Sequence, residues 1–528
     1  MSATATVQLQ DVQGYTLDNH RWWVLGVAVL GSFMSILDST VVNIALPKLI
    51  AVFNTDVHGA QWVLTSYLLA LAIVIPMTGY LDERFGGKNV YILTIALFTI
   101  ASALCGFSWS LNSMIFFRVL QGLGGGLIMP LGMILLLREF RPEERGAAMG
   151  IFGIPLMLGP AFGPTLGGYL VQYVDWRFIF YINLPIGIFA VIAASRVLRD
   201  VPRRLGQTLD VWGIALVALG SGSLLLGIGN GPADGWTSGT VIAEVVIGIA
   251  SLISFVVVEL SVPHPLLELR LFRSLTFSTA VFVTLVVQVG LFGAIFLLPL
   301  FLQNLRGMGA METGMLLIPQ ALTVSIVMPI AGKIFDRFGP KVLLVPGLSL
   351  LAISTYMFHT LGVNTPNIQI IEWLMLRGVG MGLAMMPATT TAMNAVPRHL
   401  LGRATALTNA LQRISGSFGT AIMATILTTR QTYQFAVTAQ TVTSASPGVR
   451  LILAHARALP GFTNLPPASA HELSLVMLTA AVRKAAAINA IDDTFFIAAL
   501  ICIPAVFVAT LVRSSGVRRS PGAMPAGE

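Results

Sequence analysis

Two charged residues lie inside long apolar stretches of the chain, where charges are rare. Asp38 lies within residues 22–46, and Arg118 lies within residues 111–137. At 1.5 Å per residue of helix, Asp38 lies about 12 Å before the end of its stretch, and Arg118 lies about 10 Å after the start of its own. Because successive helices alternate in direction, these two ends are expected on the same side of the protein. Loss of water favours the neutral form of a carboxyl group, whereas a nearby cation favours the charged form. The pair is therefore a candidate proton site, and the alternative is a static ion pair that only joins two helices.

The spacing of glycines in residues 146–170 is a second pattern with chemical meaning. Gly159, Gly163 and Gly167 recur every four residues, so on a helix they form one stripe that a facing backbone can approach closely. Pro164 removes a backbone hydrogen bond and bends the helix. Ordinary small-residue packing explains any one of these glycines, but it explains the whole spacing poorly. The stripe predicts a close helix contact on which conformational change depends.

The elements that position these residues are membrane-spanning helices. Of the 528 residues, 55% are hydrophobic and only 10% are charged, whereas soluble domains carry roughly 25% charged residues. This composition excludes a soluble enzyme, a disordered chain and a disulfide-rich secreted protein. A spanning helix needs about 20 apolar residues. Fourteen stretches qualify: 22–46, 59–81, 89–108, 111–137, 146–170, 177–197, 211–230, 239–260, 275–302, 312–334, 341–361, 367–393, 402–428 and 493–513.

The basic residues predict the orientation of these spans. With the N-terminus in the cytoplasm, the inner segments hold 20 of the 31 Lys and Arg residues, and the short outer loops hold three. Cytoplasmic loops are enriched in Lys and Arg, so both termini (1–21 and 514–528) are expected inside the cell, and the protein in the cell (inner) membrane. The long loop 429–492 is expected outside. A helix near 470–490 either lies on the outer surface or extends the last span.

The sequence also repeats itself. The segment Gly79–Lys88 resembles Gly332–Lys341, Arg118 corresponds to Arg377, and Arg145 corresponds to Arg403, at offsets of 253 to 259 residues. Paired halves around a site near the midplane of the membrane are typical of secondary transporters. The predicted units are a six-helix bundle at 22–197, a linker with two inserted helices at 198–274, and a second six-helix bundle at 275–513.

These motifs resemble those of the major facilitator superfamily. The glycine run of residues 150–168 resembles its antiporter motif, Gly79–Lys88 its loop 2–3 motif, and Arg118–Gly122 its helix 4 motif. Further segments resemble the fourteen-helix drug:proton antiporters of the QacA/EmrB type: Leu37–Pro47, Gln61–Trp62 with Thr65 and Tyr67, Trp176–Pro185 and Asp492–Phe496. The resemblance covers nearly the whole chain. It implies an all-α polytopic membrane protein with the major facilitator fold.

The resemblance further implies proton-coupled export of amphipathic small molecules, with Asp38 and Arg118 coupling the proton. The family motifs assign a role in conformational gating to Gly79, Asp82, Glu83, Arg84, Gly86, Gly159, Gly163, Pro164, Gly167, Gly168, Asp336 and Arg337. Candidate residues of the substrate pathway are Asn43, Tyr67, Gln121, Asn409 and Arg413.

Two positions of this chain depart from the family pattern. Glu83 stands where the loop 2–3 motif has Asp, with Asp82 just before it, so either acid is a candidate for the inter-helix contact. Gly87 stands where the family has a basic residue. In addition, QacA-like exporters of dicationic drugs share a pattern with an added acid in helix 10, whereas residues 312–334 hold no acid deeper than Glu312. The resemblance therefore does not imply specificity for dications. Glu372 is expected to pair locally with Arg377, because the two lie close along one helix.

Other functions are excluded or kept as alternatives. The chain has no complete phosphate-binding loop, and its seven histidines are scattered without metal-ligand spacing, so neither an enzyme nor a metal or other cofactor is expected. The proton gradient is the expected energy source. The expected partners are a small-molecule substrate, protons and the lipid bilayer, with a periplasmic adaptor protein as a candidate and no nucleic acid. The alternatives are a dedicated exporter of an endogenous lipid or metabolite, and a proton-independent facilitator.

Overall fold

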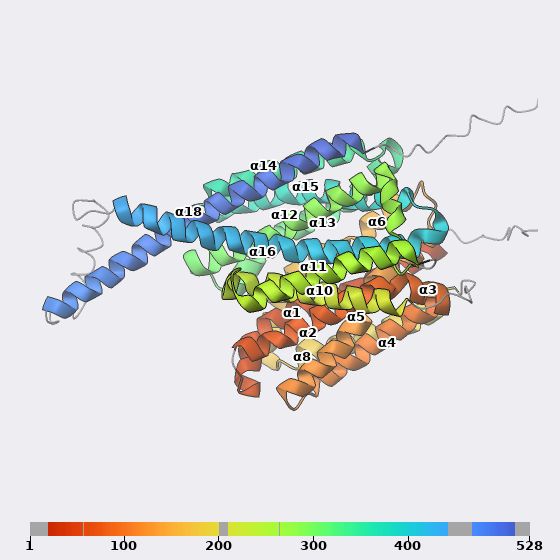
Figure 1. Ribbon diagram of the computed structural model, residues 1–528, viewed down its shortest axis with the longest axis horizontal. Coiled ribbons are helices and arrows are strands. Elements are labelled where there is room, and N and C mark those ends of the chain that lie inside the picture. The colour runs from red at the N-terminus through yellow and green to blue at the C-terminus, as the bar shows by residue number, and fades with distance from the viewer. Residues whose placement is uncertain (1–18, 56, 200–209, 263–264, 442–466, 513–528) are drawn as a thin grey trace, which may run out of the picture.

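The computed structural model describes residues 19–55, 57–199, 210–262, 265–441 and 467–512. The predicted cytoplasmic segments 1–18 and 514–528 lie outside the described residues. The described part of the chain is built from helices and turns, without a strand (Figure 1). The helices are α1 (His20–Phe53), α2 (Val57–Val74), α3 (Thr78–Phe85), α4 (Gly87–Gly106), α5 (Leu111–Glu139), α6 (Arg145–Phe152), α7 (Ile154–Tyr169), α8 (Phe178–Tyr181), α9 (Asn183–Val197), α10 (Val211–Asp234), α11 (Gly239–Ser261), α12 (Leu275–Leu300), α13 (Ala310–Phe338), α14 (Lys341–Met357), α15 (Asn367–Asn394), α16 (Leu401–Thr441) and α18 (Pro467–Leu511).

Short 3₁₀-helical or π-helical turns join some of these helices into longer units. They are η1 (Ile75–Met77), η2 (Leu170–Val174), η3 (Leu269–Arg273), η4 (Phe301–Leu305), η5 (Phe358–Thr360) and η6 (Arg398–Leu400). The second span is therefore α2, η1 and α3 in series, and the fifth is α6, α7 and η2. Proline explains two of the irregularities, because Pro76 lies in η1 and Pro155 lies at the start of α7.

Thirteen helical units of the described chain are long and apolar enough to cross a membrane. Each of them overlaps one of the predicted spans. The remaining prediction, 402–428, falls in α16, which packs between α12 and α18 as part of the same bundle. Polar residues make α16 less apolar than the others, and they include Arg403, Asn409, Gln412 and Arg413. The fourteen-helix prediction is confirmed.

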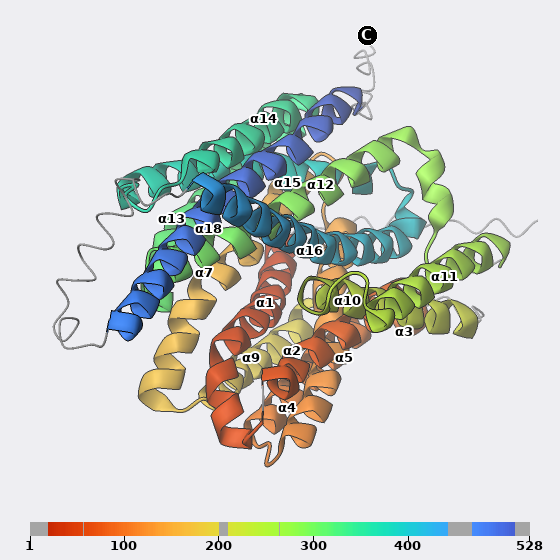
Figure 2. The same ribbon diagram turned by 60° about the vertical axis from the view of Figure 1, so that its left-hand side comes forward.

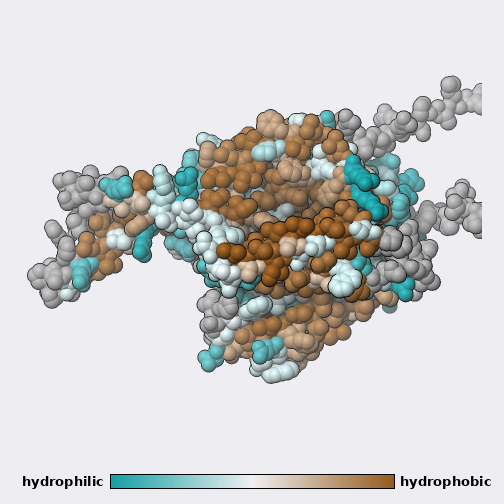
Figure 3. All heavy atoms as spheres, viewed as in Figure 1, coloured by the Kyte–Doolittle hydropathy of each residue, from teal (hydrophilic) through white to brown (hydrophobic). Residues whose placement is uncertain are grey.

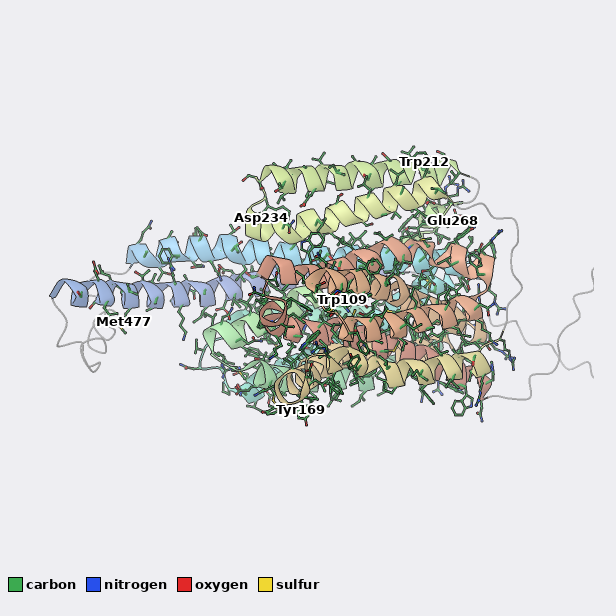
Figure 4. All side chains as sticks on the ribbon, turned by 90° about the horizontal axis from the view of Figure 1, so that it is seen from below. Trp109, Tyr169, Trp212, Asp234, Glu268 and Met477 are labelled. Atoms are coloured by element: carbon green, nitrogen blue, oxygen red, sulfur yellow. The ribbon has the colours of Figure 1, made fainter. Side chains whose placement is uncertain are left out.

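The helices form two halves that face each other (Figure 2). The first half runs from α1 to α9 and the second from α12 to α18, and one large apolar cluster joins them, with members such as Met149 of α6 and Met328 of α13. On the face shown in Figure 3, the surface between the two ends of the bundle is largely hydrophobic. In the following, the terminal end is the end of the bundle at which α1 begins and α18 ends. Trp212 and Glu268 lie near it, whereas Trp109 and Tyr169 lie toward the opposite end (Figure 4).

The inserted helices α10 and α11 pack against each other and lie beside both halves. Helix α10 contacts α2 of the first half and α16 of the second. Leu224 and Ile228 of α10 form a small apolar cluster with Ala421 of α16. Trp236, in the turn between α10 and α11, donates a hydrogen bond from Nε1 to Thr425 Oγ1 at 2.9 Å. The inserted pair therefore covers one seam between the halves.

The predicted long loop 429–492 begins with helix, which the prediction did not include, and ends with helix, which was one of its two alternatives. Helix α16 continues to Thr441, and α18 already begins at Pro467, with residues 442–466 outside the described part. The two helices project beyond the bundle as an arm, with Met477 near its far end (Figure 4). Gln434 of α16 donates a hydrogen bond to Asp493 Oδ2 at 2.8 Å, and Arg430 lies 3.7 Å from the same atom. Of the two alternatives for residues 470–490, the structure supports extension of the last span.

Candidate functional site

The glycine stripe of α7 positions α1, the helix that carries Asp38. A Cβ atom added at Gly159 would collide with Ile36, one at Gly163 with Thr40, and one at Gly167 with Val41. Thr40 Oγ1 also donates a hydrogen bond to the carbonyl oxygen of Gly159 at 3.2 Å. The α1 residues that the stripe contacts lie on either side of Asp38 in the chain. The stripe therefore fixes the helix that holds the acid.

The two other predicted gating residues of this segment, Pro164 and Gly168, do not belong to the stripe. Pro164 lies inside α7 beside the stripe, at a half-buried position. A Cβ atom added at Gly168 would meet nothing within 4 Å. Gly168 is therefore not part of the close contact with α1.

Asp38 and Arg118 form a buried ion pair between α1 and α5. Arg118 Nη1 lies 2.7 Å from Asp38 Oδ2, and the side chains of both residues are fully shielded from solvent. Gln121, one turn further along α5, donates from Nε2 to Asp38 Oδ1 at 2.9 Å and accepts from Arg118 Nη1 at 2.7 Å. The two residues of equal predicted depth are therefore in contact, as both the proton site and the static ion pair require.

A third helix completes the site with a residue that the sequence analysis did not assign. Asn183 of α9 donates from Nδ2 to Asp38 Oδ1 at 2.8 Å, and the same nitrogen lies 3.0 Å from Ser102 Oγ of α4. Ser102 donates to the carbonyl oxygen of Phe180 at 2.9 Å. An asparagine at the start of an apolar stretch, within the family-like segment Trp176–Pro185, was the signal that would have identified it.

Arg118 is further held by the second span. Its Nε donates to the carbonyl oxygen of Val63 at 3.1 Å. Its Cζ lies 4.1 Å from the ring centroid of Tyr67, within the range of a cation–π contact. The Tyr67 hydroxyl lies 3.5 Å from Ser35 Oγ. Tyr67 and Gln121, predicted for the substrate pathway, therefore belong to the buried cluster around Asp38.

This geometry defines what the site can do chemically. The Asp38 carboxylate accepts hydrogen bonds from Arg118, Gln121 and Asn183. Loss of either charge of this buried ion pair would leave the other without its counter-charge in an apolar interior, which is costly. The site therefore joins α1, α5 and α9 through one carboxylate.

The other predicted pathway residues lie in different settings. Asn43 is exposed on α1 and bonds its own helix, at 3.5 Å from the carbonyl oxygen of Ser39. Asn409 of α16 is buried and donates to the carbonyl oxygen of Thr405 at 2.9 Å. Arg413 of α16 has an exposed side chain.

The predicted pair of Glu372 with Arg377 is wrong. Arg377 donates to Thr355 Oγ1 at 2.7 Å and to the carbonyl oxygen of Gly290 at 2.8 Å. Glu372 is exposed, and within the described residues it forms no ion pair. Five residues of helix correspond to a rotation of about 140° around the axis. One side chain therefore points into the core while the other points outward.

At the terminal end, the loop 2–3 motif joins the two halves through α3. Asp82 accepts two hydrogen bonds from Arg138 of α5, at 2.9 and 2.6 Å, inside the first half. Glu83 lies 3.5 Å from Arg403 Nη2 of α16, in the second half. Gly79 allows this approach, because its added Cβ would lie 3.1 Å from the backbone nitrogen of Arg403. The choice left open between the two acids is settled: each makes a contact, and Glu83 makes the one between the halves.

Two further residues of this motif lie at the turn that follows α3. Gly86 has a φ of 86°, a left-handed conformation that favours glycine, and it ends α3 directly before α4. Arg84 is half-buried on α3.

The second copy of this motif, Gly332–Lys341, makes the equivalent contact from the second half to the first. The Asp336 carboxylate of α13 accepts hydrogen bonds from the backbone nitrogens of Gly146 and Ala147, at 2.9 and 3.0 Å. Negative charge is favourable at the N-terminus of a helix, here that of α6. Arg145 donates to Asn394 Oδ1 of α15 at 3.1 Å. Arg337 is exposed. The two halves are therefore closed against each other at the terminal end.

Comparison with known proteins agrees with this architecture. Residues 28–420 match the family model described as Major Facilitator Superfamily. An uncharacterized MFS-type transporter of Bacillus subtilis, YhcA, is 37% identical over 424 residues, which cover 80% of each chain. A multidrug resistance protein B homolog of Mycobacterium tuberculosis is 35% identical over 85% of this chain and 84% of its own. The lincomycin resistance protein LmrB of Bacillus subtilis is 30% identical over 76% and 85%.

Solved structures share the fold. The human organic anion transporter MFSD10 superposes with a TM-score of 0.59 at 13% identity, covering 93% of this chain and 99% of its own. The proton:xylose symporter XylE superposes with a TM-score of 0.56 at 14% identity, covering 94% and 96%. The family match and the relatives named as transporters indicate a transporter of small molecules in a lipid bilayer, and not an enzyme. The chain belongs to the Major Facilitator Superfamily.

The buried ion pair gives a prediction about stability. Asp38→Asn leaves Arg118 buried without its counter-charge, which typically costs about 3–5 kcal/mol, so thermal unfolding of the purified protein should begin at a clearly lower temperature. Asp38→Asn combined with Arg118→Gln removes both charges and should recover most of that loss. Unfolding temperatures of the two variants and the wild type, in one detergent, measure this. A double variant less stable than Asp38→Asn would contradict the pairing.

The glycine stripe gives a second prediction. Gly163→Ala should destabilise the protein by about 1–3 kcal/mol, because its new methyl group collides with Thr40 in a close-packed contact. Gly168→Ala is the matched control on the same helix and should change stability by less than about 0.5 kcal/mol. Thermal unfolding and substrate transport are measured for both. Equal effects at the two positions would show that the α1–α7 contact does not depend on the stripe.

Proposed function

We propose that this protein is a proton-coupled antiporter that exports amphipathic small molecules, as a multidrug efflux system. The observation that carries the proposal is the Asp38 carboxylate, buried in the first half and held by donors from two other helices. An intramembrane acid with a named partner is a functional candidate by default. Protonation would neutralise Asp38 and weaken its bond to Arg118.

The packing suggests how such a change reaches the rest of the molecule. Helix α1, which carries Asp38, packs through the glycine stripe against α7, and α6 and α7 pack against α13 of the second half. A Cβ atom added at Gly150 of α6 would lie 2.5 Å from the carbonyl oxygen of Met328 in α13. Small shifts of α1 are thereby passed to the contacts between the halves, which have discrete closed and open arrangements.

The orientation is part of the proposal. The positive-inside rule puts the terminal end in the cytoplasm and the protein in the cell membrane. The structure then represents a state closed to the cytoplasm. The arm of α16 and α18 would stand outside, where it offers a surface to a periplasmic adaptor protein.

The names of the relatives support export of drug-like compounds. Relatives at 35% and 30% identity are named for multidrug resistance and for lincomycin resistance. A dedicated exporter of an endogenous lipid or metabolite would share the same buried site. A proton-independent facilitator would share only the fold. The substrate and the coupling are therefore tested separately.

Transport assays in vesicles test the coupling. Uptake of the neutral dye dansyl-glycinamide into inverted vesicles is driven by an imposed pH gradient. In Asp38→Asn this uptake should fall to the background of empty vesicles, because the asparagine side chain cannot take up a proton. Glu312→Gln is the matched control, since it removes an exposed acid at the outer start of α13. It should transport like the wild type. Full transport by Asp38→Asn would remove Asp38 from the coupling role, and uptake by the wild type without a pH gradient would support a facilitator.

A further inference from the structure

Arg413 stands apart from the other deep charges of the bundle. It lies in α16, twelve residues after that helix begins at Leu401, or about 18 Å from the terminal end. Because it lies in the interior of a membrane protein, a charge at this position is expensive unless it has a partner or access to water.

Two observations place its side chain between the halves. The side chain of Arg413 is exposed, so it is not enclosed in the close-packed core. Ala410, one turn earlier on the same face of α16, packs against the apolar cluster of the first half, and α16 also contacts α5 of that half. Arg413 therefore faces the first half, above the contacts that close the terminal end, and its exposure indicates an internal opening between the halves at this level.

Within the described residues, Arg413 has neither a hydrogen bond nor an ion pair. The other deep arginines are satisfied differently: Arg118 has the Asp38 carboxylate, and Arg377 has a hydroxyl and a carbonyl oxygen. The deep acid of the first half, Asp38, is held by its own partners and is 1% exposed. Asp38 therefore offers the opening no negative charge.

The charge balance of the second half points the same way. Its spanning helices carry Arg377 and Arg413 deep in the bundle, while three of their acids, Glu312, Asp336 and Glu372, lie near helix ends. Asp492 and Asp493 lie inside α18, where Asp493 contacts Gln434 and Arg430 at the base of the arm. Charges at the ends are screened within about 10 Å at ordinary ionic strength. The internal opening is therefore electropositive and attracts anions.

We propose that Arg413 binds the anionic group of the substrate, so that this transporter prefers amphipathic molecules with a carboxylate, sulfonate or phosphate over neutral or cationic ones. The guanidinium group presents a planar fork of donors that matches these groups in two parallel hydrogen bonds. This inference rests on the proposed export function for its transport consequences. The binding step itself needs no proton gradient.

Binding of three related dyes to the purified protein tests the proposal. Dansyl-glycine is anionic, dansyl-glycinamide is neutral and dansyl-cadaverine is cationic, and their fluorescence reports binding in detergent. The wild type should bind dansyl-glycine about tenfold or more tightly than dansyl-glycinamide, as expected for a charge-assisted pair. Arg413→Gln should lose this preference while keeping its affinity for the neutral dye, and Arg413→Lys should keep part of it.

A control and two contrary outcomes make the test decisive. Arg430→Gln removes the same residue type from the same helix, but in the arm, where Arg430 lies near Asp493, and it should keep the full preference for the anion. Unchanged preference in Arg413→Gln would overturn the proposal, as would wild-type protein that binds the anionic dye no better than the other two. If the preference holds while a pH gradient drives uptake of neither the anionic nor the neutral dye, the export proposal fails and the binding role of Arg413 stands.

Discussion

A charge in the apolar interior of a membrane protein must be neutralised by a partner or given access to water, and the centre of this molecule is organised around that requirement. Asp38 and Arg118 neutralise each other across two helices, and Gln121 and Asn183 fill the remaining hydrogen-bonding positions of the carboxylate. Because these partners come from α5 and α9, the carboxylate on α1 joins three helices at one point. The same requirement explains why Arg377 turns away from Glu372 toward a hydroxyl and a carbonyl oxygen of the core.

The contacts between the halves follow a simpler rule of close approach. Gly146 and Gly332 bring the backbones of α6 and α13 together, and Gly79 does the same for α3 and α16. Around these glycines, Asp336 and Glu83 supply the charged contacts. The first half is thus joined to the second at one end by features of both copies of the repeated motif. The glycine stripe of α7 works inside the first half instead, where it holds the helix of Asp38.

Much of this arrangement was predictable from the sequence, because a lipid environment constrains it. The spans follow from the length of the apolar stretches, and the pairing of Asp38 with Arg118 follows from their equal depth. The partner of Arg377 was not predictable, since depth and spacing do not fix the direction of a side chain around the helix. Asn183 was missed because a neutral amide in an apolar stretch looks ordinary until the carboxylate beside it is known. The arm was only one of two alternatives, because residues 470–490 contain both charges and apolar groups and are compatible with water or with a membrane surface.

The central claim is that Asp38 exchanges a proton for substrate, and a substrate gradient alone tests it most directly. Vesicles containing the protein and a pH-sensitive dye are loaded with dansyl-glycinamide and diluted at equal pH, with potassium and valinomycin holding the voltage at zero. Outward flow of the neutral dye through the wild type should carry protons inward and acidify the vesicle interior, and Asp38→Asn should show no acidification beyond protein-free vesicles. Substrate flow through the wild type without any pH change, or equal acidification in both proteins, would contradict the account.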